Sequence, residues 1–434
     1  MSSTARPPVP SEPLLWLQQL SVLRGPTHPA RGDDALIAAD GTLLALGDDA
    51  AQQGRAAGLT PRVEPDWLLA PTLVDPHSVL EQPLRSRAET LQSLAIAAAQ
   101  GGYGQVALLP WGERPRDHLE GLQLRWDPPQ QLHLWGSLSL GDAGLELSPH
   151  SELLQAGAIG LASAADLPAP SLLQRSMELG EAASQPLLIA PRQRSLSNAG
   201  LVRERIEALR AGWPIDPVAS ETLPLATLIS LQQSHPQQRL VAMNLSTQEA
   251  VEALAASSSG LQATVHWWQL LQDSSRLAPT ARGWRLEPPL GGPADRRALQ
   301  QALQSGLISA VAVHHQALDA EEQLLPIDQR RVGLAGHGLV LPLLWQALVE
   351  AGGWTIQQLW QGLCWGPCAV LGLPPELLSA GSRRWLLYDP GAQWTWSPGP
   401  RGSLAANQPL ADGTVINGLV RATGLLPQAS WQLS

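Results

Sequence analysis

The sequence contains no lysine and no phenylalanine, and it has only two cysteines. Without lysine, the chain cannot form a Schiff base, hold a phosphate with a P-loop lysine, or bridge two metals with a carbamylated lysine. Cys364 and Cys368 lie four residues apart around a Gly-Pro pair. An isolated pair of this kind predicts two reduced structural thiols rather than a zinc or redox site. The 17 tryptophans are expected to fill core volume that phenylalanine fills elsewhere.

Excess positive charge and long apolar runs are also lacking. The formal net charge of −10 argues against nucleic acid as the main partner, because phosphate binding needs a basic surface. No apolar run reaches the roughly 18 residues that a membrane helix needs, and residues 1–8 lack the pattern of a signal peptide. We therefore expect a cytoplasmic protein that does not bind membranes. A chain of 434 residues predicts one large domain and a smaller one.

Short apolar runs alternate with longer amphipathic stretches through the middle of the chain. The strand-like runs are residues 68–74, 105–109, 131–140, 159–161, 186–190, 239–243, 261–264 and 307–313. The helix-like stretches are residues 87–100, 172–183, 223–233, 247–256 and 295–304. About eight such units are typical of a TIM-type (β/α)8 barrel, an α/β fold.

Strand signals also occur at both ends of the chain. Residues 36–47 contain two apolar runs around Asp40-Gly41, a strong hairpin signal. Residues 384–390 and 414–420 also indicate strands. We expect both termini to build a small composite β-domain from residues 12–70 and 380–434, with the barrel formed by residues 71–379.

The most informative motif is Asp75-Pro76-His77-Ser78-Val79, which follows a buried strand. Two histidines at positions 77 and 79 would lie on the same side of the strand and could bind one zinc ion. Valine at position 79 cannot bind a metal. Active groups of TIM barrels sit where strands end, which makes five polar residues candidates for one pocket at the barrel mouth. These are His77, Asn244, His266, His314 and His315.

An ordered set of short segments resembles the cyclic amidohydrolases, and most closely the dihydroorotases. The segments are residues 97–102, 157–161, 245–247, 288–290, 295–299 and the tail from Asn407 to Gly418. The resemblance implies an amidohydrolase-type barrel that holds zinc through histidines and a bridging carboxylate or carbamylated lysine. It also implies that zinc-bound hydroxide attacks a cyclic amide while an aspartate transfers the proton.

Most of the groups implied by this resemblance are replaced. At the positions of metal ligands and of the catalytic aspartate, the sequence has Val79, an out-of-register Asp166, Ala190, Asn244 and His314. His315 falls at the position of a substrate-contacting histidine. At the positions that bind the substrate carboxylate, it has Glu81, Trp111 and Glu287. We therefore predict no catalytic residue, no metal ligand and no cofactor, and a vestigial pocket formed by the five candidates. Glu321-Glu322 is expected to be a solvated pair rather than an acid/base pair.

Three hypotheses of function remain open. The first is an inactive dihydroorotase-like protein of pyrimidine synthesis that acts as a structural partner; the resemblance makes aspartate transcarbamoylase the candidate partner. The second is a working cyclic amidohydrolase with a rebuilt mononuclear zinc site at His77, His266 and His314. The third is a protein that binds a small molecule in the barrel mouth. The sequence leaves a homo-oligomer open.

Overall fold

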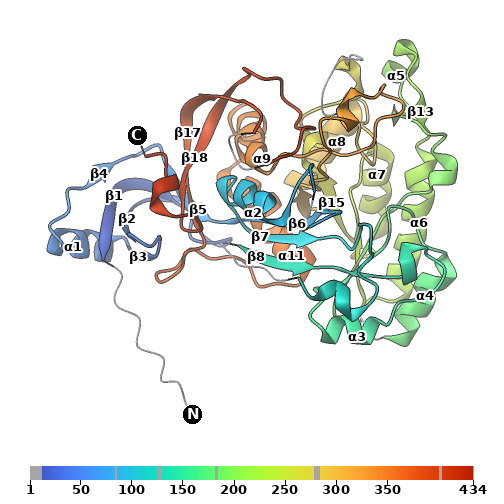
Figure 1. The fold of residues 1–434 in the computed structure, drawn as a ribbon, viewed down its shortest axis with the longest axis horizontal. Helices are drawn as coiled ribbons and strands as arrows, with labels where there is room; N and C mark the ends of the chain where they lie inside the picture. Colours follow the sequence, from blue (N-terminus) through green and yellow to red (C-terminus); the bar gives the residue numbers. More distant parts are fainter. Residues whose placement is uncertain are drawn as a thin grey trace.

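The structure, a computed structural model, describes residues 12–83, 86–124, 130–180, 184–277, 284–399 and 403–433. A parallel barrel surrounded by helices lies beside a mainly antiparallel sheet built near the two chain ends (Figure 1). Within the described ranges, no helix is long and apolar enough to cross a membrane.

Two parallel sheets form the barrel. The first has the order β16 (Ala310–Ala312), β15 (Gln262–His266), β14 (Arg239–Ala242), β11 (Pro186–Ile189), β10 (Leu161–Ala162) and β9 (Gly136–Ser137). The second has the order β6 (Leu73–Ser78), β7 (Tyr103–Leu108) and β8 (Gln131–Leu134). Strands β8 and β9 follow each other in the chain and together occupy one strand position of the barrel, because β8 pairs with β7 and β9 pairs with β10. A parallel bridge between Val79 and Gln316 joins the other two edges. The expected TIM-type barrel is confirmed.

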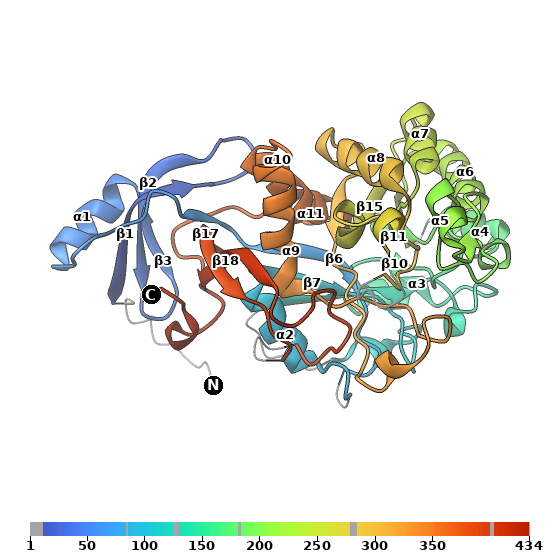
Figure 2. The ribbon, with the colours of Figure 1, turned by 90° about the horizontal axis from the view of Figure 1, so that it is seen from above.

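Helices cover the outside of the barrel, and α4 to α8 gather at the end away from the terminal sheet (Figure 2). Helix α1 (Asp48–Ala56) instead packs on the terminal sheet. The other helices are α2 (Leu91–Gln100), α3 (His150–Gln155), α4 (Pro170–Leu179), α5 (Ile206–Ala211), α6 (Ala219–Ser234), α7 (Gln248–Ser257), α8 (Pro293–Gln304), α9 (His337–Leu344), α10 (Ile356–Trp360) and α11 (Gly366–Leu371). Helix α2 begins later than the predicted residue 87, because Thr90 caps it and its side chain accepts the N–H of Ser93.

A seven-stranded sheet combines segments from both ends of the chain. Its order is β18 (Val415–Thr423), β17 (Trp385–Thr395), β5 (Leu68–Pro71), β1 (Pro13–Val22), β2 (Arg31–Ala38) and β3 (Leu43–Leu46), with β4 (Arg62–Val63) on β1. The predicted hairpin is the antiparallel β2–β3 pair. Gly41 in its turn has φ of 87°, a conformation that residues with a Cβ rarely adopt. A short separate pair, β12 (Val202–Arg203) and β13 (Ile215–Asp216), flanks α5.

Apolar side chains fill the barrel interior. The main buried members are Val74, Val79, Ala107, Leu109, Trp135, Ala162, Leu188, Val241, Met243 and Cys368, with Trp111 packed against them. Val79 is thus a core residue, 2% exposed. Cys364 and Cys368 are buried and not disulfide-bonded, as predicted. The interior has the packing of a core rather than of an open channel.

Candidate functional site

Four of the five candidate residues meet at the carboxyl ends of the barrel strands. His77 lies in β6, His266 ends β15, and Asn244 and His314 follow β14 and β16. All four are buried, with exposures of 5% or less. The parallel order of the strands brings them together, because adjacent parallel strands end at the same face.

His77 is hydrogen-bonded through both ring nitrogens to other side chains. Its Nδ1 lies 3.0 Å from Nδ1 of His314, and its Nε2 lies 2.9 Å from Oγ1 of Thr264. Two neutral imidazoles can share this contact only if one is the donor and the other the acceptor. A hydrogen-bonded chain therefore runs from Thr264 through His77 to His314. The tautomer of His77 determines whether Nδ1 of His314 is the donor or the acceptor.

Burial keeps these imidazoles neutral. It lowers the pKa of His77 well below its usual value, and the neighbouring His314 and His266 lower it further. Burial lowers the pKa of His314 to about 4, although Asp75 and Glu287 act in the opposite direction. The cluster carries no positive charge at neutral pH.

His266 and Asn244 complete the cluster. Nδ1 of His266 accepts the backbone N–H of Trp268 at 3.1 Å, and its ring centroid lies 6.0 Å from that of His314. Burial lowers the pKa of His266 well below its usual value, and repulsion from His314, when that ring is protonated, lowers it further. The backbone N–H of Asn244 donates to Oγ1 of Thr264 at 2.9 Å.

Asn244 and His314 share an unusual backbone conformation. Their φ angles are 54° and 45°, in the left-handed region that residues with a Cβ rarely occupy. Such conformations cost of order 1–3 kcal/mol and gather at functional sites. This strain is kept at two positions where the sequence departs from the resembled family.

His315 lies apart from this cluster. Its Nε2 is 3.3 Å from a carboxylate oxygen of Glu89, and its ring is 5.1 Å from that of His337. His337 in turn lies 3.0 Å from Asp75. Burial alone would raise the pKa of Glu89, but the hydrogen bond and charge of His315 lower it overall. The predicted five-residue pocket is therefore divided, and His315 lies instead with Glu89 and His337, two residues that no local motif marks.

Two members of the cluster, Asn244 and His314, line a cavity of only about 20 Å³. A cavity of this size holds about one water molecule. The lining residues are Trp111, Ala165, Ala190, Pro191, Arg192, Glu221, Met243, Asn244, Glu287, Pro288 and His314. Glu287, one of the replaced positions, forms an ion pair of 2.9 Å with Arg192 at this cavity. Arg192 also donates to Asp216 at 2.8 Å.

Two tryptophan side chains pack at the barrel mouth and are held there by hydrogen bonds to backbone carbonyls. Trp135 donates from Nε1 to the carbonyl of Pro76 at 3.0 Å. Trp111 donates to the carbonyl of Ser163 at 2.8 Å, and its ring meets that of His314 edge to face at 5.5 Å. Large side chains therefore occupy the space around position 79.

The residues present do not fit the zinc site that the fold family implies. Both nitrogens of His77 and Nδ1 of His266 are engaged by protein groups. Val79 offers no ligand atom. Within the described ranges, no group of three or more His, Cys, Asp and Glu side chains is arranged to hold a metal ion.

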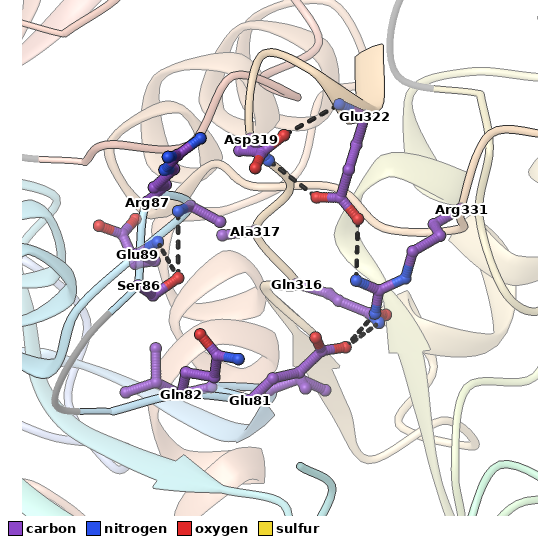
Figure 3. Close-up of a pocket in the computed structure, with 13 residues that line it drawn as sticks. Glu81, Gln82, Ser86, Arg87, Glu89, Gln316, Ala317, Asp319, Glu322 and Arg331 are labelled. Atoms are coloured by element: carbon purple, nitrogen blue, oxygen red, sulfur yellow. Dashed lines mark hydrogen bonds and ion pairs between the residues drawn. The ribbon is translucent and has the colours of Figure 1, made fainter. Parts of the chain in front are cut away.

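A larger cleft of about 640 Å³ opens beside the mouth, between the loops that follow β6 and β16 (Figure 3). On one wall, Arg331 donates to Glu81 and, at 2.9 Å, to Glu322. Glu321 instead pairs with Arg87 at 3.0 Å, and both side chains are 79% exposed. Glu321 and Glu322 thus have separate arginine partners and do not converge as an acid/base pair.

Comparison with known proteins identifies the family. A probable dihydroorotase-like protein of Synechocystis sp. is 36% identical over 379 residues, which cover 79% of this chain and 85% of that protein. The chain belongs to the dihydroorotase-like cyclic amidohydrolases. The dihydroorotase of Bacillus licheniformis is 27% identical over 323 residues, 72% of this dihydroorotase-like chain and 75% of the Bacillus protein.

Solved structures agree on the fold. The L-hydantoinase of Arthrobacter aurescens superposes with a TM-score of 0.75, covering 94% of each chain at 18% identity. The D-hydantoinase of a Thermus species has the same TM-score and covers 95% of this dihydroorotase-like chain and 94% of its own, at 17% identity. At these identities the likeness concerns the fold alone. No family model matches the chain.

Proposed function

We propose that this dihydroorotase-like chain is not a catalyst and acts by binding another protein. The observation that carries the proposal is the contact of 3.0 Å between Nδ1 of His77 and Nδ1 of His314. The resemblance places a zinc ligand at position 77 and the proton-transferring aspartate at position 314. Here these two side chains bind each other, so neither has the partner that hydrolysis needs.

The closed mouth supports the same proposal. The cavity beside the cluster, about 20 Å³, is far smaller than the 300–1,000 Å³ typical of ligand pockets. Glu81, at the position where the resemblance expects a carboxylate-binding arginine, is paired with Arg331. A dianionic substrate would therefore meet no free cation at that position and a carboxylate in its place.

The candidate partner is aspartate transcarbamoylase. If the fold is retained without catalysis, selection must act on another property of the protein. A protein–protein interface is the simplest such property. The partner itself comes from the resemblance to dihydroorotases, not from a residue of this chain. A stable interface of this kind would bury about 1,600 Å² in total.

The decisive experiment measures metal content and turnover together. Purified chain, incubated with excess zinc and then desalted, is expected to retain much less than one zinc per chain. It is also expected neither to cyclise carbamoyl aspartate nor to open dihydroorotate. About one zinc per chain, with turnover lost in His77→Ala and His314→Ala, would instead establish the rebuilt hydrolase.

A further inference from the structure

Helix α5 presents an apolar ridge at the end of the molecule that also holds α7 and α8 (Figure 1). The ridge consists of Ile206 and Leu209, whose side chains are 56% and 60% exposed. Residues three apart lie on one face of a helix, so the two side chains stand next to each other. Ala208, between them in the sequence, is buried and packs α5 onto the body of the protein. An adjacent pair of exposed aliphatic side chains favours contact with another apolar surface.

Contacts on both sides of α5 hold this ridge in place. Before the helix, Arg205 donates to Asp295 at 2.7 Å and to Glu249 at 3.0 Å. These two carboxylates belong to the first turns of α8 and α7. After the helix, the ring of Trp213 meets that of Trp284 at 4.8 Å between centroids. The ridge is therefore already ordered, and binding to it would not have to supply the cost of ordering.

A groove of about 500 Å³ lies between α7 and α8, next to the ridge. Its apolar lining consists of Val251, Ala294, Ala298, Ala302 and Leu307. Because three of these side chains are only methyl groups, another helix can approach α8 closely. Arg205, which precedes the ridge, is bound to the first turns of both helices that form the groove. Ridge and groove therefore lie side by side.

The ridge and the groove carry charges that are not paired within the chain. In the part of the chain that the structure describes, Glu207 and Arg210 of α5 form no ion pair, and neither does Arg297 of α8. Glu252 of α7 accepts only the side-chain amide of Gln248, at 2.7 Å. Arg297 and Glu252 line the groove. A ridge placed in a groove can therefore match Glu207 with Arg297, and Arg210 with Glu252.

The occupant that fits both features is a second copy of this chain. A surface with a ridge beside a groove is self-complementary about a two-fold axis between them, because the rotation brings each ridge over the groove of the other copy. We propose that the dihydroorotase-like chain forms a two-fold homodimer in which Ile206 and Leu209 of each copy enter the α7–α8 groove of the other. This inference goes beyond the proposed partnership with aspartate transcarbamoylase and does not depend on it.

Analytical ultracentrifugation of the full chain tests the dimer. The wild type should sediment at twice the mass of one chain at micromolar concentration. Leu209→Glu should raise the dissociation constant about a hundredfold or more, because each dimer would bury two carboxylates in apolar contacts. Leu179→Glu is the matched control, since Leu179 ends α4 with a similar exposure of 52%, and it should leave the dimer unchanged. Circular dichroism verifies that both variants are folded.

Two rescue experiments test the contact between ridge and groove. Ala298→Trp should fill the groove and make the chain monomeric, yet an equal mixture with Leu209→Glu should form a heterodimer, which keeps one intact ridge and one intact groove. Arg297→Glu should weaken the dimer about tenfold, and the addition of Glu207→Arg should restore it. The charge exchange decides the question alone if Ala298→Trp fails to fold. A monomeric wild type would overturn the proposal and leave the groove to another protein. A Leu209→Glu dimer as stable as the wild type, or the failure of either rescue with folded variants, would overturn it as well.

Discussion

Nε2 of His337 lies 3.0 Å from a carboxylate oxygen of Asp75, although one residue begins a helix and the other lies in the first barrel strand. The same carboxylate accepts the backbone N–H of Val313 at 3.0 Å and the hydroxyl of Ser78. Asp75 therefore joins β6, the segment after β16 and α9. Asp75, the first residue of the Asp75–Val79 motif, thus has a structural role at the closure of the barrel.

Asp75→Ala should destabilise the protein by about 3–5 kcal/mol, because it leaves several buried donors without an acceptor. Urea unfolding followed by circular dichroism measures the change. The exposed Asp328→Ala serves as the control and should change the free energy of unfolding by less than about 0.5 kcal/mol. An equal effect of the two substitutions would contradict the role given to Asp75.

Stability should fall on acidification through the titration of His314. Its folded pKa is about 4, below the 6.5 of an unfolded histidine, so the unfolded chain binds more protons between these values. The contribution is complete above pH 6.5 and decreases as the pH falls to about 4, by about 3 kcal/mol at most.

Free energies of unfolding at several pH values test this expectation. His314→Gln should reduce the loss between pH 6.5 and 4. His118→Gln should not reduce it, because the hydrogen bond and charge of Asp117 raise the pKa of that exposed histidine. A His314→Gln variant with the pH slope of the wild type would show that His314 is not the group responsible.

Val79→His should not restore catalysis. His77 would still be bound to His314 and Thr264, and the new imidazole would have to enter the apolar filling of the barrel. Groups that act as a unit recover little when a single member returns. Zinc content and dihydroorotate turnover of the variant should remain at wild-type levels; measurable hydrolysis would mean that the site is less degraded than its contacts indicate.

Co-elution with aspartate transcarbamoylase from the same source tests the proposed partnership. A mixture at micromolar concentration should elute from gel filtration as one complex larger than either component. Ovalbumin at the same concentration is the negative control. Separate peaks, with no change in transcarbamoylase activity or stability, would reject this partner and leave ligand binding as the role to pursue.

The fold was predictable because its signals are local. The Asp40-Gly41 turn specifies the hairpin, and Thr247, the first residue of the predicted helix-like stretch 247–256, caps α7 by accepting the N–H of Ala250. The alternation of apolar runs and amphipathic stretches predicted the barrel. Strands of a parallel barrel are buried on both faces and therefore appear in the sequence as continuous apolar runs.

The site was predictable only in part because its contacts join distant segments. His315 points away from its neighbour His314, and it faces Glu89, which lies far from it in the chain. The pairing of Arg192 with Glu287 depends on two loops that only the folded barrel brings together. Neither the sequence around Arg192 nor that around Glu287 indicates the other.

The pairing of β5 with β17 has a consequence for how the protein is made. Pro71 lies opposite Trp385, so β5, a central strand of the terminal sheet, pairs with a strand from the far end of the chain. During synthesis β1 and β5 leave the ribosome long before β17, and until then the edge of β5 has no strand beside it. The long sequence separation also favours slow closure of the sheet. A nascent or C-terminally truncated chain therefore presents the apolar residues Leu68–Pro71 as an open edge, the place where premature association with other chains would begin.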